Sequence, residues 1–569
     1  MNPLTDEPNP DQPPPEDAAP TPESPARPDG TTAEQEAVRP FAAAVRTVGG
    51  LTLLSRFGGL ARDLLTARLM GDTPIGSAFM AAWAIPNLFR RLFGEGALAA
   101  AFIPEYAQLA KHDPERADQF ATLTLALLTL ITGCLLIAGE VLLLVLLVAT
   151  GTADPDRDLS LRLIMVMLPF MPLVCIAAIL GGMLQTHGRF GPTAAAPIIL
   201  NALVIAAALP FFLAESPDRV QAAYWIGAAA VLAGALQVAW SLWALRGLVR
   251  WRRGFAQATA PMRRLLSRFL PVVIGMGTIQ LNAFFDTLIA MWPLWVGPTI
   301  LGIAYPLDTS ANAVLSFTQR LYQFPLGVFG IAIATAIFPL LSRHADEPAH
   351  FLATLRRGLR LSLFLGLPAT AGLLLVRHDL TTVMYGGSHS AFSDEGTARA
   401  AAVLMGYAPG IWAYSLNHVA TRAFYAAGDT RTPMRIALVI VAVNLALNCT
   451  LIWKLGEAGL AWSTSISAIL QLILLTRFSR KLTHERTLDR PTIGGFSKTI
   501  LATLAMAAAV LLVGTLLTFP ATWLGSLAHL GLAVGVGGGS FFLLTLLLGQ
   551  HELRWLLPRR RPKVRPSRR

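Results

Sequence analysis

The 569-residue chain contains little charge. Asp, Glu, Lys and Arg make up 14% of its residues, whereas 54% are hydrophobic, and its mean hydropathy is +0.54. Soluble domains average about 25% charged residues, so this chain cannot cover the polar surfaces of several soluble domains. Cysteine is also scarce. Cys134, Cys175 and Cys449 lie in separate apolar runs, which excludes a disulfide scaffold and a zinc-site spacing.

The motifs of soluble enzymes are missing as well. The sequence contains no Walker A motif, and its ten histidines lack metal-ligand spacing. We therefore predict a transporter rather than an enzyme, without a cofactor other than the cation considered below. The net charge of +12 makes a nucleic-acid binder an alternative, but the basic residues sit mostly in short segments between apolar stretches. That pattern is typical of a polytopic membrane protein at an anionic leaflet, so we expect contact with membrane lipids and not with nucleic acid.

The first 41 residues differ in composition from the rest. They are rich in proline and acidic residues and have almost no apolar content. Such a segment cannot bury enough surface to offset its chain entropy, which predicts a disordered cytoplasmic tail over 1–41. It lacks the basic stretch and apolar core of a signal peptide. We therefore expect the first membrane helix to direct insertion.

Long apolar stretches dominate the remaining sequence. A spanning helix needs about 20 mostly apolar residues, and these runs lack the short alternating pattern of membrane strands. They predict an all-α polytopic membrane protein with about fourteen transmembrane helices. The candidate spans are 43–70, 76–108, 117–150, 159–186, 192–214, 220–246, 266–292, 306–342, 354–376, 398–427, 432–453, 457–477, 497–519 and 524–549.

Basic residues predict the orientation. They gather in one set of connecting segments, whereas the alternate loops contain few of them. The positive-inside rule then places both termini in the cytoplasm of a multi-pass protein of the cell inner membrane. The basic segments are 246–268, 356–360, 477–490 and 559–569, and the weakly charged loops include 71–74 and 151–155.

Two segments repeat one another. Ala99–Leu123 and Ala334–Leu355 share small residues, an aromatic residue and proline, a short polar loop ending in acid-Pro, and then Phe and Thr-Leu. Chance similarity of alanine-rich helices is the alternative. A true repeat predicts two parallel six-helix lobes with a substrate site between them near the membrane centre. The predicted parts are a tail at 1–41, lobes at 42–250 and 251–480, two extra helices at 481–550 and a basic cytoplasmic tail at 551–569.

Arginines inside the predicted helices indicate a polar cavity. An intramembrane Arg that faces lipid costs from about 3 to over 10 kcal/mol, depending on the method. Arg also donates two parallel hydrogen bonds to phosphate and keeps its charge. We therefore predict an anionic, phosphate-containing headgroup as substrate. Snorkelling to the membrane surface is the alternative. The predicted substrate-binding residues are Arg56, Arg62, Arg90 and Arg320.

Other charges near these arginines suggest ion pairs or gating contacts. Arg91 and Glu95 are spaced i, i+4, which allows a local helix pair. Arg62 and Asp63 are adjacent and should point in different directions. We therefore expect Asp63 to pair with another helix.

A glycine pair separates two of the arginines. Arg56 and Arg62 lie about 120° apart on a regular helix. Gly58 and Gly59 between them would allow local unwinding, since glycine tolerates unusual backbone angles. Unwinding here would bring both arginines into one cavity.

Three oxygen-bearing residues lie on two later helices. Asp286 lies in the seventh span, and Asn444 and Asn448 are four apart on one face of the eleventh. Carboxylate and amide oxygens can coordinate a small hard cation such as sodium. Hydrogen bonding between the helices is the alternative and the one we favour.

Several motifs together resemble the MurJ (MviN) lipid II flippases of the MOP exporter superfamily. The resemblance covers about residues 42 to 550, and the combination is more specific than any one motif. The matching motifs are Ser55–Asp63, Ile85–Arg91, Glu95–Ala97, Ala101–Pro104, Gln319–Gly330 and Phe424–Pro433.

The resemblance implies a fold and a function. Family members have fourteen helices in two lobes and move lipid II, an undecaprenyl-diphosphate-linked peptidoglycan precursor, from the inner to the outer leaflet. The extra two helices form a groove for the lipid tail. Some relatives bind sodium near helices seven and eleven. The family's cavity arginines fall on Arg56, Arg62, Arg90 and Arg320, and its acidic residues on Asp63 and Glu95.

The sequence departs from the family at two positions. The family often has Asp where Ser77 stands, and often Lys where Ala84 and Ile85 stand, which puts a gate or counter-ion role there in doubt. Two other functions stay open at this point. One is export of a polysaccharide or drug by another MOP-type transporter, and the second is a non-transporting membrane scaffold that binds cell-wall synthesis proteins.

Overall fold

A computed structural model describes residues 33–91, 97–151, 154–252, 254–483, 485 and 487–556. The chain divides into two compact units, Met1–Gly49 and Gly50–Arg569, and the packing described below concerns the second. The predicted disordered tail is partly wrong. Residues 1–32 lie outside the described residues, but 33–41 belong to helix α1 (Ala33–Met70). The segment Ala33–Val38 contains alanine, glutamate and glutamine, which favour helix despite their polarity.

Helices form almost all of the described chain. The exception is a two-stranded antiparallel hairpin, β1 (Thr299–Ile300) with β2 (Ile303–Ala304). After α1, the helices are α2 (Pro74–Phe89), α3 (Ala97–His112), α4 (Pro114–Thr150), α5 (Pro155–Met167), α6 (Phe170–Thr186), α7 (Gly191–Leu213), α8 (Arg219–Ala244), α9 (Thr259–Trp295), α10 (Ala311–Pro325), the π-helix η3 (Leu326–Ile331), α11 (Ala332–Arg343), α12 (Pro348–Leu375), α13 (Arg377–Tyr385), α14 (Asp394–Tyr407), the 3₁₀ helix η4 (Ala408–Gly410), α15 (Ile411–Ala426), α16 (Arg431–Leu455), α17 (Glu457–Thr483), α18 (Arg490–Leu516), α19 (Trp523–Leu547) and α20 (His551–Leu556).

Local sequence signals explain where several helices begin. Asp113, Asp154 and Asp489 each accept backbone N–H groups of the helix that follows them, and proline occupies the first turn in each case. An acidic N-cap satisfies the unpaired donors at a helix start, and proline has no N–H to satisfy there. An aspartate followed by proline within two residues therefore marks a helix boundary that can be recognised in the sequence.

The helices confirm a multi-pass membrane protein. In the described part of the chain, nine helices are long and apolar enough to cross a membrane. Each of the fourteen predicted spans falls on one helix or on a consecutive series, as 306–342 does on α10, η3 and α11. The number of crossings stays a prediction. Outward-facing side chains of α4, such as Leu130, Ile137 and Val148, are exposed, as expected where lipid is the solvent.

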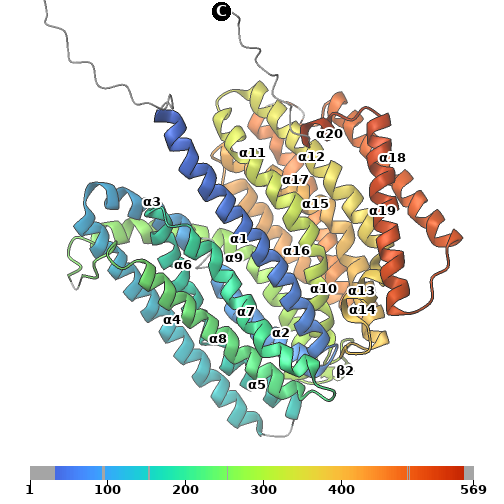
Figure 1. Ribbon diagram of the computed structural model, residues 1–569, viewed down its shortest axis with the longest axis horizontal. Coiled ribbons are helices and arrows are strands. Elements are labelled where there is room, and N and C mark those ends of the chain that lie inside the picture. The colour runs from blue at the N-terminus through green and yellow to red at the C-terminus, as the bar shows by residue number, and fades with distance from the viewer. Residues whose placement is uncertain are drawn as a thin grey trace, which may run out of the picture. The chain divides into compact units, whose positions relative to one another are not determined.

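Two groups of helices pack around α9. We call α2–α8, together with residues 50–70 of α1, the first group, because Arg62 of α1 contacts Asn201 of α7 and Trp83 of α2. We call α10–α17 the second group (Figure 1). Helix α9 contacts α3 of the first group and α16 of the second, and α18 packs on α12. The ion pair of the exposed Arg264 with the buried Glu105, 2.6 Å between Nη2 and Oε1, joins α9 to α3. The predicted six-helix lobes, with their boundaries at 250 and 480, stay a prediction.

The two repeated segments adopt similar local structures. Helices α3 and α11 each contain a proline, Pro104 and Pro339, and each is followed by a long helix that starts at a proline, Pro114 or Pro348. Helices α2 and α3 fall within one predicted span, 76–108, as α10, η3 and α11 fall within 306–342. The similarity therefore extends beyond the sequence letters to the positions of the helix breaks.

Candidate functional site

Two adjoining cavities lie between the helix groups. The smaller contains about 270 Å³ of space outside protein atoms and the larger about 630 Å³, each partly open to solvent. Both are lined by Met80 and Trp83 of α2 and by Arg320 of α10. The smaller cavity adds Arg62, Asp63, Thr66, Phe79 and Phe317, and the larger adds Ala84, Asn87, Leu88, Arg91, Gln280, Ala283, Phe284, Thr287, Ser316 and Gln319.

Arg62 is held by three different contacts. Its Nη2 lies 2.7 Å from Oδ1 of Asp63, and its Nη1 donates to Oδ1 of Asn201 at 3.0 Å. The guanidinium carbon lies 5.2 Å from the ring centroid of Trp83, within the range of a cation–π contact. These contacts come from α1, α2 and α7, so the arginine is oriented before any ligand binds.

The prediction that Asp63 pairs with another helix is wrong. The carboxylate pairs with the neighbouring Arg62, not with another helix. Adjacent positions do diverge at the backbone, but the four-bond arginine side chain is long enough to fold back to its neighbour. Asp63 is one-quarter exposed and lines the smaller cavity.

The expected unwinding at Gly58 and Gly59 is also wrong. Helix α1 is continuous through both residues. A Cβ on Gly58 would lie 3.3 Å from Nδ2 of Asn201, and this amide donates to the carbonyl of Ser55 at 2.9 Å. The small residues therefore allow α7 to approach. Arg56 stays on an exposed face of α1 and lines neither cavity.

Asn201 is a site residue that the sequence interpretation missed. It is buried and joins the Ser55 carbonyl to the Arg62 guanidinium. The available signal was a single amide in the otherwise apolar run 197–213. A buried polar group requires hydrogen-bond partners, so such an amide marks a contact with another polar element.

The paired arginines at the end of α2 have separate partners. Nε of Arg90 donates to Oδ1 of Asn87 at 2.8 Å, and Nη1 of Arg91 contacts Oε1 of Gln280 at 3.4 Å. Arg91 lines the larger cavity, whereas Arg90 lines neither. Glu95, the predicted partner of Arg91, lies outside the described residues.

Arg320 is a charged residue that belongs to the walls of both cavities. It is half-buried on α10 and lines both of them. Among the described residues, no carboxylate forms an ion pair with it. The structure thus brings Arg62 and Arg320 together, from different helix groups, and places Arg91 beside them. It does not bring Arg56 or Arg90 to the cavity walls.

Asp286, Asn444 and Asn448 form one buried cluster. Nδ2 of Asn448 donates to Oδ1 of Asp286 at 2.6 Å and contacts Oδ1 of Asn444 at 3.3 Å. Ser463 of α17 donates to the Asn448 amide oxygen. The predicted proximity of α9 and α16 is confirmed, and the favoured reading of interhelical hydrogen bonds is observed.

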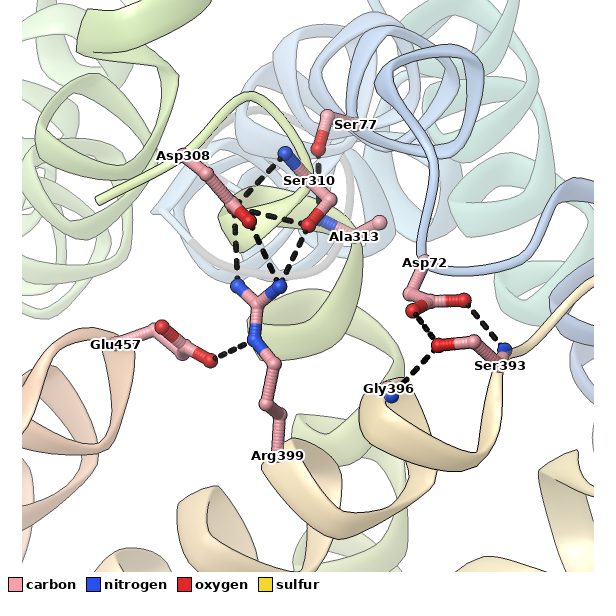
Figure 2. Close-up of polar contacts among 9 residues, drawn as sticks. All are labelled: Asp72, Ser77, Asp308, Ser310, Ala313, Ser393, Gly396, Arg399 and Glu457. Carbon is pink, nitrogen blue, oxygen red and sulfur yellow. Dashed lines mark hydrogen bonds and ion pairs between the residues drawn. The ribbon is translucent and has the colours of Figure 1, made fainter. Parts of the chain in front are cut away.

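The two helix groups also meet at the loop between α1 and α2. Figure 2 shows Asp72 of this loop facing Ser393, the N-cap of α14. The carboxylate accepts the Ser393 N–H at 2.8 Å and its hydroxyl at 2.6 Å. We call these bonds, together with those of Ser77 described next, the loop contact. Asp72 was not singled out from the sequence, because a loop carboxylate carries no signal of its distant partner.

Ser77 meets the start of α10. Its hydroxyl oxygen accepts the N–H of Ala313 at 3.0 Å, and its carbonyl accepts Nδ2 of Asn312 at 2.9 Å (Figure 2 draws the first). Ser77 is completely buried. A helix N-terminus attracts an acceptor because its N–H groups are unpaired. The serine therefore makes the contact without the negative charge that the family's aspartate would bring.

An arginine holds the segment that leads into α10. Arg399 of α14 donates to Asp308 at 2.8 Å and to Glu457 at 2.7 Å (Figure 2). Burial acts to raise the pKa of Asp308, but the hydrogen bond and charge of Arg399, with help from Ser310, outweigh it and lower that pKa below its ordinary value. Asp308 therefore stays ionised at neutral pH and keeps the start of α10 in place.

Glycine is required at two places in the loop contact. Gly71 has φ +67°, and a Cβ there would lie 2.3 Å from the carbonyl oxygen of Ala391. A Cβ on Gly396 would lie 2.1 Å from Oδ2 of Asp72. A larger residue at Gly71 would require the backbone to move, and one at Gly396 would displace the Asp72 side chain from its bonds to Ser393. The two helix groups therefore approach each other here at a distance that glycine allows.

Comparisons with known proteins agree on one family. The family model described as "Lipid II flippase MurJ" matches residues 66–533. The probable lipid II flippase MurJ of Rhizobium tropici is 32% identical over 91% of this chain and 96% of its own length. The probable lipid II flippase MurJ of Vibrio cholerae is 31% identical, and the match covers 88% of this chain and 95% of the relative.

Solved structures show the same fold. A structure of lipid II flippase MurJ in an inward closed conformation matches with a TM-score of 0.73 at 22% identity. The match covers 89% of this chain and 99% of the MurJ chain. An inward-facing multidrug MATE transporter of the MOP superfamily matches with a TM-score of 0.57 at 14% identity. The match covers 81% of this chain and 98% of the transporter. The sequence matches and the shared fold place this chain in the MurJ family of lipid II flippases.

Proposed function

We propose that Arg62 and Arg320 bind the diphosphate of lipid II, the substrate that flippases of this family translocate across the membrane. The observation that carries the proposal is that the two arginines come from different helix groups and line one cavity. A guanidinium donates paired, charge-assisted hydrogen bonds to phosphate oxygens. A bound diphosphate would therefore connect the two groups through its own charge.

In an alternating-access cycle, the cavity would open first toward the cytoplasmic leaflet and then toward the periplasmic leaflet. We propose that the loop contact is the closed outer gate, with Asp72 and Ser77 on the periplasmic side and the headgroup entering from the cytoplasmic leaflet. The hydrogen bonds of the loop contact are few, and those between Asp72 and Ser393 are exposed to solvent. They can exchange for water when the groups separate. The headgroup then leaves toward the periplasmic leaflet, while Asp63 replaces it as the partner of Arg62.

The lipid tail stays outside the cavities in this proposal. Helices α18 and α19 expose Leu504, Leu511, Leu543 and Leu547, and these apolar side chains suit a polyprenyl chain. We further propose that both termini lie in the cytoplasm and the protein in the inner membrane, and the distribution of the basic segments supports this orientation. Cell-wall synthesis proteins are proposed as partners only because they produce and consume the same lipid.

We also propose a sodium ion at Asp286. Its carboxylate is buried, and among the described residues no basic side chain pairs with it. The amide oxygens of Asn444 and Asn448 and the hydroxyl of Ser463 are the other oxygen donors nearby. A buried carboxylate without a cation is costly, so the donor set fits sodium. Sodium should raise the melting temperature of the wild-type protein and not that of Asp286→Asn; equal shifts in both would contradict the site.

The test of the main proposal is a leaflet-exchange assay of labelled lipid II in vesicles that contain the purified protein. Arg62→Ala and Arg320→Ala should each weaken headgroup binding roughly ten- to hundredfold, because a hydrogen bond to a charged group contributes about 1.5–3 kcal/mol. Arg343→Ala is the control, since Arg343 is exposed at the end of α11. Wild-type exchange by both cavity variants at matched protein levels would refute the proposed site.

A further inference from the structure

The connection between α9 and α10 has an unusual composition for an exposed segment. From Trp292 to Leu307 the sequence contains no Asp, Glu, Lys or Arg. This stretch includes the hairpin of β1 and β2, and none of its four strand residues is buried. By contrast, the exposed connection between α7 and α8 carries Glu215 and Asp218. A hairpin this short is marginally stable in water by itself, so we expect it to rest on a surface.

The tip of the hairpin carries a strained leucine. Leu301 has φ +51° and Gly302 has φ +81°, and Leu301 is the one non-glycine residue of the described chain with a positive φ. Turns of this kind usually carry Asn-Gly or Asp-Gly, because a leucine adopts positive φ at a cost. The Leu301 side chain is also 98% exposed. The fold gains nothing from such a residue, which points to a partner outside the chain.

Aromatic side chains link the hairpin to a membrane helix. Tyr305, directly after β2, stacks on Trp292 of α9 with ring centroids 5.8 Å apart and meets Trp453 of α16 edge-on at 6.4 Å. Helix α16 is long and apolar enough to cross a membrane, and Trp453 is exposed in its last turn. Trp and Tyr gather where a membrane meets water. The hairpin therefore continues the exposed apolar surface of α16 at the level of the lipid headgroups.

We propose that the hairpin tip, formed by Ile300, Leu301 and Ile303, inserts into the lipid leaflet and anchors the connection between α9 and α10. The leaflet is the one on the side of the loop contact, because Asp308 at the end of this connection pairs with Arg399 there.

The composition of the hairpin favours lipid over a protein partner. A protein interface usually has a polar rim. Between Trp295 and Tyr305 the one hydrogen-bonding side chain is that of Thr299. The proposal goes beyond the proposed function and does not depend on how the substrate binds.

The test places a fluorescent probe on the hairpin and leaves its tip intact. In the chain with Cys134, Cys175 and Cys449 replaced by serine, Thr299→Cys is labelled with nitrobenzoxadiazole, because Thr299 is exposed on β1. The full-length protein is placed singly in lipid nanodiscs. An apolar segment at the interface reaches about 5–10 Å into the boundary between headgroups and acyl chains, so phosphatidylcholine brominated in its upper acyl chains should lower the emission about twofold. Ser216→Cys, in the exposed connection after α7, is the matched control and should keep its emission.

Two substitutions at the tip separate anchoring from a structural role. Leu301→Asn removes the apolar side chain but suits the positive φ. It should keep or raise the melting temperature in detergent and reduce the quenching of the Thr299 probe to that of the control. Leu301→Met keeps the apolar character and should retain the quenching.

Two outcomes would overturn the anchor. Equal quenching of the Thr299 and Ser216 probes would place the hairpin in water or under a protein surface. Quenching that persists in Leu301→Asn would show that the helices alone set its depth. Neither outcome involves Arg62 or Arg320, so the proposed function is tested separately.

Discussion

Removing the Asp72 side chain should open the loop contact. In Asp72→Ala, the N–H and the hydroxyl of Ser393 lose their shared acceptor, which lies at 2.8 and 2.6 Å in the wild-type structure. The contact joins the loop after α1 to the N-terminus of α14, so no bond within either helix group is broken. The substitution therefore acts on the balance between the closed and open arrangements more than on folding.

The size of the effect follows from these two bonds. A hydrogen bond to a charged group contributes about 1.5–3 kcal/mol, but solvent reaches both Asp72 and Ser393 and compensates for part of the loss. We expect a net shift of about 1.5 kcal/mol for the pair. This corresponds to roughly a tenfold larger open population. Ser77 keeps its bond to Ala313 in the variant, which limits the opening.

Accessibility of a cysteine measures the opening. Ser316→Cys places a nearly isosteric reporter in the wall of the larger cavity, in a background in which Cys134, Cys175 and Cys449 are replaced by serine. A membrane-impermeant maleimide added to whole cells should label the reporter about tenfold faster with Asp72→Ala. Asp154→Ala is the matched control, because Asp154 also accepts two hydrogen bonds, both from backbone N–H groups, but lies at the start of α5.

Two results would refute the reasoning. An unchanged labelling rate in Asp72→Ala would show that the loop contact does not hold the gate closed. An equal increase in Asp154→Ala would show that any lost helix cap loosens the protein. A faster rate in Asp72→Ala alone supports the contact between the groups as the gate.

Three further predictions concern other contacts. Asn201→Leu should lower the rate of lipid II exchange in vesicles about tenfold at normal expression, because Arg62 loses the hydrogen bond that orients it. Exchange at the wild-type rate would contradict this role of Asn201. Arg360→Leu should lower the free energy of unfolding by about 3–5 kcal/mol in thermal melts, since Glu552 is 1% exposed and would keep a buried charge. The double variant Arg360→Leu/Glu552→Leu should recover most of that loss, and a double variant as unstable as the single one would argue against the ion pair. Because the pKa of Asp308 is lowered in the folded protein, its stabilising effect is complete above the unfolded value of about 3.9 and disappears only as the pH falls through the folded value. The maleimide labelling rate of the reporter, divided by that of a fully exposed cysteine at the same pH to remove the titration of the thiol, should therefore be constant from pH 8 to 5, and Asp308→Asn should raise this ratio at every pH.

Much of the fold could be predicted from the sequence because its signals are local. A helix long enough to cross a membrane is visible as an apolar run, and an acid-Pro pair such as Asp113-Pro114 marks the start of the next helix. The arginines stood out because charge is costly in lipid. The same reasoning identified the family from motifs that are contiguous in the chain. It misjudged residues 33–41, where polar composition was read as disorder although the residues favour helix.

The candidate site was only partly predictable, because its contacts join distant residues. Arg62 and Arg320 were expected to share a cavity, and they do. Arg56 and Arg62 were not brought together, since the helix between them stays regular and its glycines serve the approach of α7. No spacing in the sequence relates Arg62 to Asn201.

The loop contact shows the same limit most clearly. Asp72 and Ser393 are 321 residues apart, and neither belongs to a motif. The sequence by itself determined which segments are long and apolar enough to cross a membrane, which side chains are too costly to face lipid, and hence that a polar interior is expected. The tertiary structure alone decided which of those side chains meet, because hydrogen bonds act over about 3 Å and that proximity depends on how the helix groups pack.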